Sequence, residues 1–406
     1  MTLLRTLAAL ARAAARRAWS VLRPVLAVVS AVGWVVAAVA LAAVVTAALL
    51  GWPEFLYLGL TLAAALAVAV LFLLGRARYR VLVELQPRRV VAGERAFGRL
   101  VVANAGSGRS AASRLELPVG RGRAEFVVPA LPAGGEHEEL FAVPTERRAV
   151  IVAGPAESVR GDALGLVRRT VRWADPVELF VHPRTVRLAP SASGLVRDLE
   201  GETTRTITDD DLAFHALRPY EPGDDRRRVH WRTTARTGTL MVRQFQETRR
   251  SEMVLVQLTD RAGYAGDDEF ELAVSITASI GAQVLREGTR LHVASDRLRL
   301  RTATRETLLD DCSRLEPLDL GAPAAREVVR AATRRLAAPS VLVVVAGSAT
   351  PLAELRAIGT LYRGDTRVVV LRAEFGAEPR IGVVADLRTV TVGALAELPR
   401  MLRRTT

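Results

Sequence analysis

This chain of 406 residues contains no lysine, so all 56 of its Lys and Arg residues are arginines. Without lysine there is no P-loop, no Schiff-base catalysis and no Ser-Lys dyad. The single cysteine, Cys312, excludes a disulfide framework, a cysteine-based zinc site and a CxxC redox pair. A disordered chain is excluded as well, because 50% of the residues are hydrophobic and only 24% are charged.

The positive charge is concentrated near the N-terminus. Residues 1–80 contain eight arginines and one acidic residue, Glu54, and so carry more than half of the net charge of +13. In this region residues 25–50 and 55–74 contain no charged residue. Each run reaches the roughly 20 apolar residues that a helix needs to cross a bilayer. The excess charge therefore indicates a membrane anchor rather than a nucleic-acid-binding protein.

The two runs predict a transmembrane helical hairpin over residues 25–80, preceded by a basic segment, 1–24. Gly51, Trp52, Pro53 and Glu54 predict the turn between the spans. A cleaved signal peptide is disfavoured, because the first run is too long and a second follows directly. Arginines flank the outer ends of the pair, which predicts a multi-pass protein of the plasma (inner) membrane with both ends in the cytoplasm. The basic segment is either a helix lying on anionic lipid or a topogenic signal.

Residues 81–183 predict an antiparallel β-sandwich, because strand-like runs recur about every ten residues between turn signals. The expected strands are 81–85, 98–103, 114–117, 124–128, 139–143, 149–152, 167–173 and 177–181. His137 and His182 are isolated, and we interpret each as a surface or capping residue. The region has no cluster of titratable groups and is typical of a binding or spacing module.

The densest chemistry lies in a linker, residues 184–250. Pro222 and Gly223 take the central positions of a type II turn. We expect Asp224 or Asp225 to cap a short helix that ends at Gly238, with a strand over 240–245. Spacings of four residues predict an ion pair from Asp224 to Arg228 and a basic ridge formed by the arginines at 228, 232 and 236.

Three interpretations of this segment remain open. In the structural one, salt bridges lock the two flanking domains together around Trp231 as a core anchor; the charged residues involved are Arg218, Asp224, Asp225 and Arg236. In the enzymatic one, the metal ligands or acid/base groups are Asp224, Asp225, His215 and His230. In the binding one, the arginine ridge contacts phosphate or an acidic partner surface. The enzymatic interpretation has no HExxH, GxSxG or glycine-rich phosphate motif to support it.

Residues 251–406 alternate apolar strands with amphipathic helices, which predicts an α/β doubly wound domain. The expected strands are 253–259, 289–294, 297–303, 340–346 and 367–371, and the expected helices are 268–286, 305–314, 324–336, 351–361 and 394–402. Ligands on such folds bind beyond the carboxyl ends of the strands. This rule points to Asp260 and to Gly347 and Ser348.

Residues 218–245 closely resemble the signature of the family known as domain of unknown function 58. The matching positions are Arg218, Tyr220, Pro222, Gly223, Asp224, Asp225, Arg227, Val229, His230, Trp231, Arg232, Ala235, Arg236, Gly238, Leu240, Val242, Arg243 and Phe245. The resemblance implies a bacterial membrane protein that partners a MoxR-type AAA ATPase and proteins with von Willebrand factor A domains. The family has no established activity.

The last domain resembles a von Willebrand factor A domain, whose first strand ends in a metal-binding D-x-S-x-S motif. Here Asp260 is present, but Ala262 and Tyr264 stand where the two serines are expected. The resemblance therefore implies a degenerate site without metal, and we interpret Asp260 as a cap or as a partner of Arg261.

These observations predict a non-enzymatic, membrane-anchored scaffold or adaptor on the cytoplasmic face. Its expected contacts are the lipid bilayer and, as the resemblance implies, a MoxR-type AAA ATPase. No cofactor, nucleic acid or small-molecule substrate is expected. The alternative is a metal-dependent enzyme that uses Asp224, Asp225 and His230.

Overall fold

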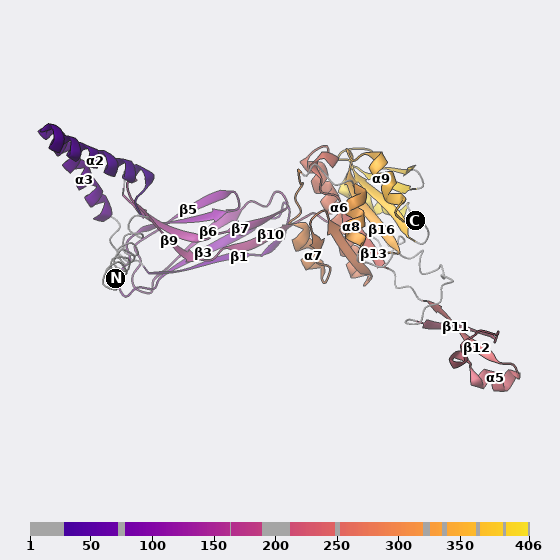
Figure 1. Ribbon diagram of the computed structural model, residues 1–406. Coiled ribbons are helices and arrows are strands. Elements are labelled where there is room, and N and C mark those ends of the chain that lie inside the picture. Colours follow the sequence, from indigo (N-terminus) through magenta and orange to yellow (C-terminus); the bar gives the residue numbers. More distant parts are fainter. Residues whose placement is uncertain are drawn as a thin grey trace, which may run out of the picture. The chain divides into compact units, whose positions relative to one another are not determined.

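The computed structural model describes residues 28–71, 78–162, 164–188, 212–247, 252–319, 325–334, 339–362, 366–384 and 387–404 (Figure 1). The chain separates into two compact units. The first contains residues 1–146 and 150–180, and the second contains residues 147–149 and 181–406. The predicted basic segment, 1–24, lies outside the described residues.

The first unit begins with two antiparallel helices, α2 (Ala31–Leu50) and α3 (Pro53–Leu71). The Ser30 side chain caps α2, and Gly51 ends it in the left-handed region at φ 71°. The predicted turn is too long, because Pro53 and Glu54 already belong to the first turn of α3. Proline fits there, since the first helical N–H has no intrahelical acceptor to lose. Residues 25–27 and 72–74 of the predicted spans lie outside the described residues.

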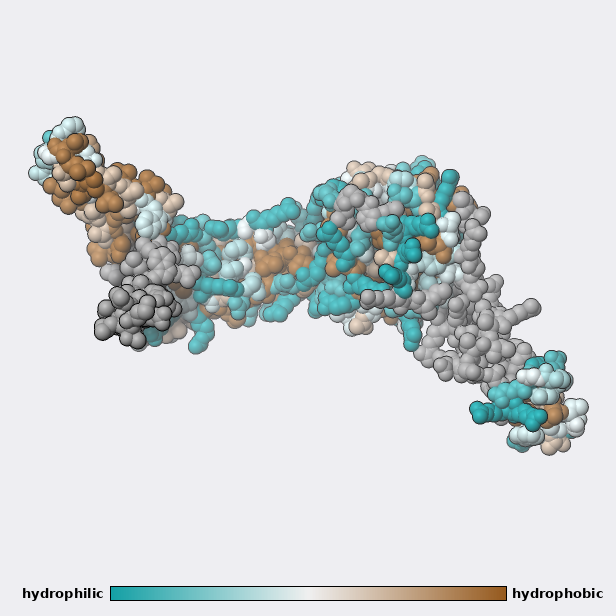
Figure 2. Space-filling view, in the orientation of Figure 1, coloured by the Kyte–Doolittle hydropathy of each residue, from teal (hydrophilic) through white to brown (hydrophobic). Residues whose placement is uncertain are grey.

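Both helices are long and apolar enough to cross a membrane, with mean hydropathies of 2.4 and 2.1. Only 17% and 11% of their most apolar windows are buried inside the protein, so most of their apolar side chains face outward (Figure 2). The helices approach closely through small residues. A Cβ atom on Gly59 of α3 would lie 2.6 Å from Cγ2 of Val44 and 3.0 Å from the carbonyl oxygen of Ala40.

The rest of the first unit is a β-rich body of two sheets. One sheet has the order β1-β3-β6 and the other β2-β10-β7-β4-β8-β9, with β5 paired to β4. The strands are β1 (Tyr79–Gln86), β2 (Arg89–Val91), β3 (Ala96–Asn104), β4 (Ser113–Val119), β5 (Gly122–Val128), β6 (Glu136–Val143), β7 (Ala149–Ala153), β8 (Ala156–Gly161), β9 (Arg168–Ala174) and β10 (Val177–His182).

Alternation of buried and exposed residues along β1 and β3 explains why the two sheets pack face to face. The rings of Phe126 and Phe141 lie 5.8 Å apart, and those of Tyr79 and Trp173 5.5 Å apart. All eight expected strands are present in this region. The short strands β2 and β8 were not predicted, because each has too few apolar residues to be recognised as a strand.

The second unit contains a mixed sheet in the order β15-β14-β13-β16-β17-β19-β18. The strands from β14 to β19 in this order are parallel, and β15 and β18 are antiparallel edges. The strands are β13 (Glu252–Gln257), β14 (Arg290–Ser295), β15 (Arg299–Leu300), β16 (Val341–Gly347), β17 (Arg367–Ala373), β18 (Arg380–Val384) and β19 (Leu387–Val392).

Helices cover both faces of this sheet. One apolar cluster joins α6 (Asp267–Arg286), α7 (Arg305–Cys312) and α10 (Leu398–Arg403) to the sheet, and the other joins α8 (Ala325–Thr333) and α9 (Leu352–Gly359). The central strand β16 is buried at every position, which is typical of a parallel strand covered on both sides.

One side chain of the second unit differs from expectation. His182 is buried, not at the surface, and its Nε2 lies 2.8 Å from Oδ1 of the buried Asp310. Burial of an imidazole requires such a partner, which lies 128 residues away and is invisible in the local sequence. Arg148 is also buried and is bound to Glu271 on α6 through two hydrogen bonds of 2.8 and 3.1 Å.

Candidate functional site

The signature residues form a small hairpin, residues 212–247, which we call the signature module. Its strands are β11 (Leu212–Pro219) and β12 (Met241–Glu247), which pair antiparallel with Arg218 opposite Val242. The pairing shifts between Phe214 and Ala216, at His215. The side chains of His215, Arg228, Arg243 and Phe245 lie outside the described residues.

Arg218 and Asp224 form a bidentate ion pair at the mouth of the hairpin. Nη1 of Arg218 lies 2.8 Å from Oδ2 of Asp224, and Nη2 lies 2.6 Å from Oδ1. Oδ2 also accepts a hydrogen bond of 2.9 Å from the backbone N–H of Glu221. The hydrogen bond to Asp224 raises the pKa of the Arg218 guanidinium. The pair closes the turn, and the N–H of Asp224 donates to the carbonyl of Glu221 at 3.1 Å.

Gly223 has φ 116°, which the third position of a type II turn requires, and Pro222 before it is exposed. Asp225 then caps a single 3₁₀ turn, η2 (Arg226–Arg228), by accepting from the N–H of Arg227 at 2.9 Å. The turn is as predicted from the sequence, and the cap is the second of the two predicted candidates, Asp224 and Asp225.

His230 begins a second short helix, α5 (Trp231–Thr237), because its Nδ1 accepts from the N–H of Thr233. The predicted single helix is therefore broken at Val229 and His230. The N–H of His230 donates instead to the carbonyl of Met241 on β12 at 2.8 Å, and that of Tyr220 donates to Leu240 at 2.8 Å. Gly238 ends α5 at φ 74°, as predicted.

Asp224, Asp225 and His230, which the enzymatic interpretation places in one site, each have a separate structural role. Asp224 holds Arg218, Asp225 caps η2 and His230 caps α5. Within the described part of the chain, no group of three or more His, Cys, Asp or Glu side chains is suited to hold a metal ion. Asp224 pairs with Arg218, six residues before it, whereas the side chain of its predicted partner, Arg228, lies outside the described residues.

The outer surface of α5 is exposed along its whole length. Trp231 is 67% exposed, so the interpretation of Trp231 as a core anchor is wrong. Arg232 and Arg236, one helical turn apart, are exposed as well, and α5 has no buried residue. With only seven residues, α5 is too short for a hydrophobic repeat that would distinguish a buried face from an exposed one. The exposure of Trp231 could therefore not be predicted from the local sequence. We call Trp231, Arg232 and Arg236 the Trp-Arg face.

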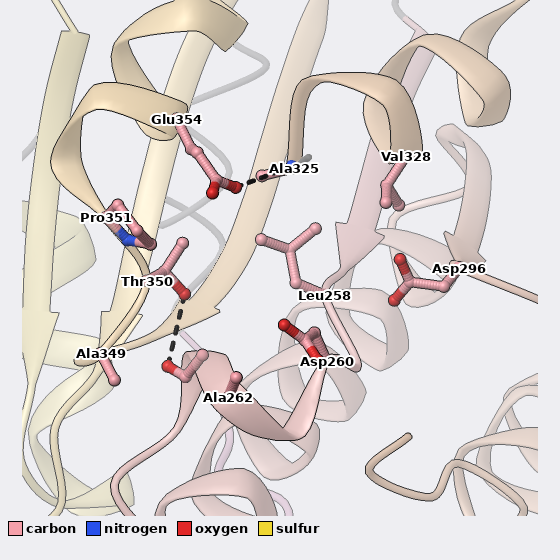
Figure 3. A pocket seen from close by; sticks show the side chains of 11 residues that line it. Leu258, Asp260, Ala262, Asp296, Ala325, Val328, Ala349, Thr350, Pro351 and Glu354 are labelled. Carbon is pink, nitrogen blue, oxygen red and sulfur yellow. Dashed lines mark hydrogen bonds between the residues drawn. The ribbon is translucent and has the colours of Figure 1, made fainter. Parts of the chain in front are cut away.

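A second candidate site is a cavity of about 200 Å³ at the carboxyl ends of β13, β14 and β16. Sequence reasoning pointed to this edge through Asp260, but it missed Asp296, Thr350 and Glu354, which also line the cavity. Figure 3 shows the carboxylates of Asp260, Asp296 and Glu354 around Leu258. The signal for Asp296 was available, since this residue directly follows β14.

Two of these carboxylates support the loops around the cavity. Oδ2 of Asp296 accepts from the N–H of Thr259 at 2.7 Å, and Oε2 of Glu354 accepts from the N–H of Ala325 at 3.0 Å. Asp260 precedes the 3₁₀ turn η3 (Arg261–Gly263), but its side chain makes no capping hydrogen bond.

The expected pairing of Asp260 with Arg261 is also wrong. Arg261 contacts Asp267 at 3.1 Å and Asp319 at 3.0 Å. Tyr264, at the second expected serine position, is buried, and its hydroxyl donates to the carbonyl of Leu258 and accepts from Nε2 of Gln257 at 2.8 Å. Burial raises the pKa of Tyr264 well above its ordinary value. This residue therefore belongs to the core beneath the cavity.

Together these features define a chain with two helices apolar enough to span a membrane, a two-sheet β body and an α/β unit that carries a surface-displayed basic hairpin. Residues 216–347 match the family model described as "Protein of unknown function DUF58". The predicted resemblance to that family is confirmed over these residues.

The uncharacterized protein YeaD of Bacillus subtilis is 32% identical over 136 residues. The match covers 33% of each chain, so this chain spans about a third of the length of that relative.

Solved structures give only weak likenesses. The CARDB domain of the PF1109 protein from Pyrococcus furiosus, described in complex with di-metal ions, is 12% identical, with a TM-score of 0.20 over 26% of this chain and 93% of that domain. The sporulation control protein Spo0M from Bacillus subtilis is 13% identical, with a TM-score of 0.17 over 32% of this chain and 58% of that chain. At these TM-scores neither likeness establishes a shared fold or function.

Proposed function

We propose that this protein is a membrane-anchored adaptor that binds a protein partner through the Trp-Arg face. The single observation that carries this proposal is the exposure of Trp231 beside Arg232 and Arg236. Tryptophan and arginine are the residues most enriched at the energetic centres of protein interfaces. A tryptophan displayed on a rigid helix loses little conformational entropy when a partner covers it.

The architecture of the module supports a docking role. The bidentate pair of Arg218 and Asp224 and the caps at Asp225 and His230 use the polar groups of the motif to fix the hairpin. The arginines of α5 form no ion pair with a described acidic side chain, which leaves their charge for an acidic surface.

We propose a MoxR-type AAA ATPase as the partner class, because the signature motif resembles a family whose members associate with such ATPases. We also propose that the α/β unit is related to von Willebrand factor A domains. Its parallel strand order β14-β13-β16-β17-β19, with helices on both faces, supports that relation.

The proposed anchor is the hairpin of α2 and α3, with both outer ends on the cytoplasmic side of the membrane. Arginines occur only outside the two spans, whereas the connection of Gly51 and Trp52 carries no charge. The adaptor face would then lie in the cytoplasm, where an ATPase is available.

A paired-arginine variant tests the docking face. In the Arg232→Ala/Arg236→Ala protein, we expect the Kd for a purified MoxR-type ATPase to rise by about tenfold or more, since loss of one or two interface arginines costs on the order of 1–2 kcal/mol. Binding would be measured with the full chain in detergent or nanodiscs.

The matched control is Arg326→Ala/Arg330→Ala, which removes two exposed arginines at the same spacing from α8. Equal weakening in both double variants would show a nonspecific charge effect and would contradict docking at α5.

A further inference from the structure

One loop of the β body is attached to the base of the helical hairpin. The N–H of Ser30 donates to the carbonyl of Leu166 at 3.0 Å, and the N–H of Arg168 donates to the carbonyl of Val28 at 2.7 Å. Oγ of Ser30 donates to the carbonyl of Gly165 at 2.5 Å. These bonds form a short antiparallel bridge between Val29 and Val167, directly before α2 begins.

Apolar contacts strengthen this attachment from both helices. Leu166 and Val167 pack with Ala69 near the end of α3, and Val36 and Leu66 lie against the same cluster. A Cβ atom on Gly33 would lie 2.1 Å from the carbonyl oxygen of Leu166, so only glycine permits this approach. The loop is thus fixed at the level where both helices leave the body.

Asp162 fixes the shape of the loop. Its Oδ2 accepts from the N–H of Leu164 at 2.9 Å, and its Oδ1 accepts from the N–H of Val167 at 2.8 Å. Gly165 completes the turn at φ 69°, in the left-handed region. Desolvation opposes ionisation of the carboxyl group, but these backbone donors outweigh it and hold the pKa of Asp162 below its ordinary value.

The consequence is that Leu164 is held outward at the tip, with 71% of its surface exposed. The loop precedes two exposed arginines, Arg168 and Arg169. Because α2 has 20 residues, about 30 Å at the helical rise, its first turn lies near one face of the hydrocarbon layer when it spans a bilayer. Residues bonded to Val28 and Ser30 then lie at the headgroup level.

We propose that Asp162 and residues 164–167 form an interfacial membrane-docking loop, in which Leu164 enters the boundary between headgroups and acyl chains. This inference rests on the proposed function of the hairpin as a membrane anchor. The loop adds a third point of contact beside the two helices, so the β body itself is held against the bilayer. Arg169 follows the loop by two residues, so we expect its side chain to reach the lipid phosphates.

The test uses the complete chain in vesicles of phosphatidylcholine and phosphatidylglycerol. The native Cys312 is buried, and burial raises its pKa to about 12, so it stays unlabelled. Leu164→Cys is labelled with a nitroxide, and the depth of the label is measured from its relative accessibility to oxygen and to a water-soluble nickel chelate. We expect a depth of roughly 5–10 Å below the phosphates, as for other interfacial segments.

Two further labelled sites separate this proposal from the one it rests on. Leu41→Cys reports the middle of α2, where the side chain is 67% exposed, and Leu140→Cys reports an equally exposed leucine on β6, 68% exposed. A label at Leu41 inside the hydrocarbon together with a label at Leu164 in water would overturn the docking loop and leave the anchor intact. A label at Leu41 in water would overturn both.

A positioning variant adds a second readout. In the Leu164→Cys background, Asp162→Ala removes both acceptors that hold the loop. We expect the label at position 164 to become more accessible to the nickel chelate while a label at Leu41 stays unchanged. An unchanged depth at position 164 would show that Asp162 does not position Leu164, and circular dichroism of the variant separates this outcome from unfolding of the β body.

Discussion

At the scale of single residues, Arg148 and its neighbour Arg147 show how burial changes what a charged side chain contributes to stability. The Arg148 side chain is 5% exposed, binds Glu271 at 2.8 Å and donates to the carbonyls of Cys312 and Ser313 at 2.9 and 3.0 Å. Its guanidinium also lies over the ring of Phe270 at 5.9 Å. Arg147 is 65% exposed, and its ion pairs with Asp268 and Asp267 are longer, at 3.4 and 3.9 Å.

We predict that Arg148→Ala lowers the free energy of unfolding of the second unit by about 3–5 kcal/mol, because Glu271 and two buried carbonyls lose their partner. Arg147→Ala, one position earlier, changes it by less than about 0.5 kcal/mol. Denaturant unfolding of the full chain in detergent measures both. A similar loss in the two variants would show that the buried contacts are not what stabilises this segment.

Residues also show the limit of reading a sequence locally. The turn at Gly223, the cap at Asp225 and the helix end at Gly238 were predictable, because each depends on backbone rules within four residues. The exposure of Trp231 and the partner of His182 were not, since both depend on what the rest of the chain packs against them.

At the scale of elements, α2 and α3 are joined by only Gly51 and Trp52. In the proposed membrane hairpin, so short a connection places both outer ends of the pair on one side of the membrane. Apolar length made these helices predictable, as alternation did for the long strands of the β body. Of the edge strands of the α/β unit, β15 was expected over a longer range, 297–303, and covers only two residues, whereas β18 was not predicted.

The proposed orientation predicts the reactivity of two introduced thiols. In spheroplasts, whose plasma membrane is intact, Trp52→Cys should react with a membrane-impermeant maleimide. Leu352→Cys on α9, where the side chain is 41% exposed, should react only after the membrane is permeabilised. The buried Cys312 gives no background. The reverse pattern would place the α/β unit outside the cytoplasm and exclude contact with an ATPase there.

At the scale of the whole molecule, the charged and aromatic residues of the family motif have two different roles. Arg218, Asp224, Asp225 and His230 fix the backbone of the signature module, whereas Trp231, Arg232 and Arg236 are displayed on its surface. The sequence motif alone did not separate these groups, because ion-pairing and surface arginines look the same in a one-dimensional pattern. The fold separates them, and the proposed docking face consists of the second group.

The most direct test of this account measures two properties of one variant, Trp231→Ala, in the full-length protein. We predict an unchanged melting temperature, since the side chain is 67% exposed, together with at least tenfold weaker binding of a MoxR-type ATPase. A melting temperature that falls while binding is unchanged would contradict the account, because Trp231 would then act as a structural anchor rather than as the centre of a docking surface.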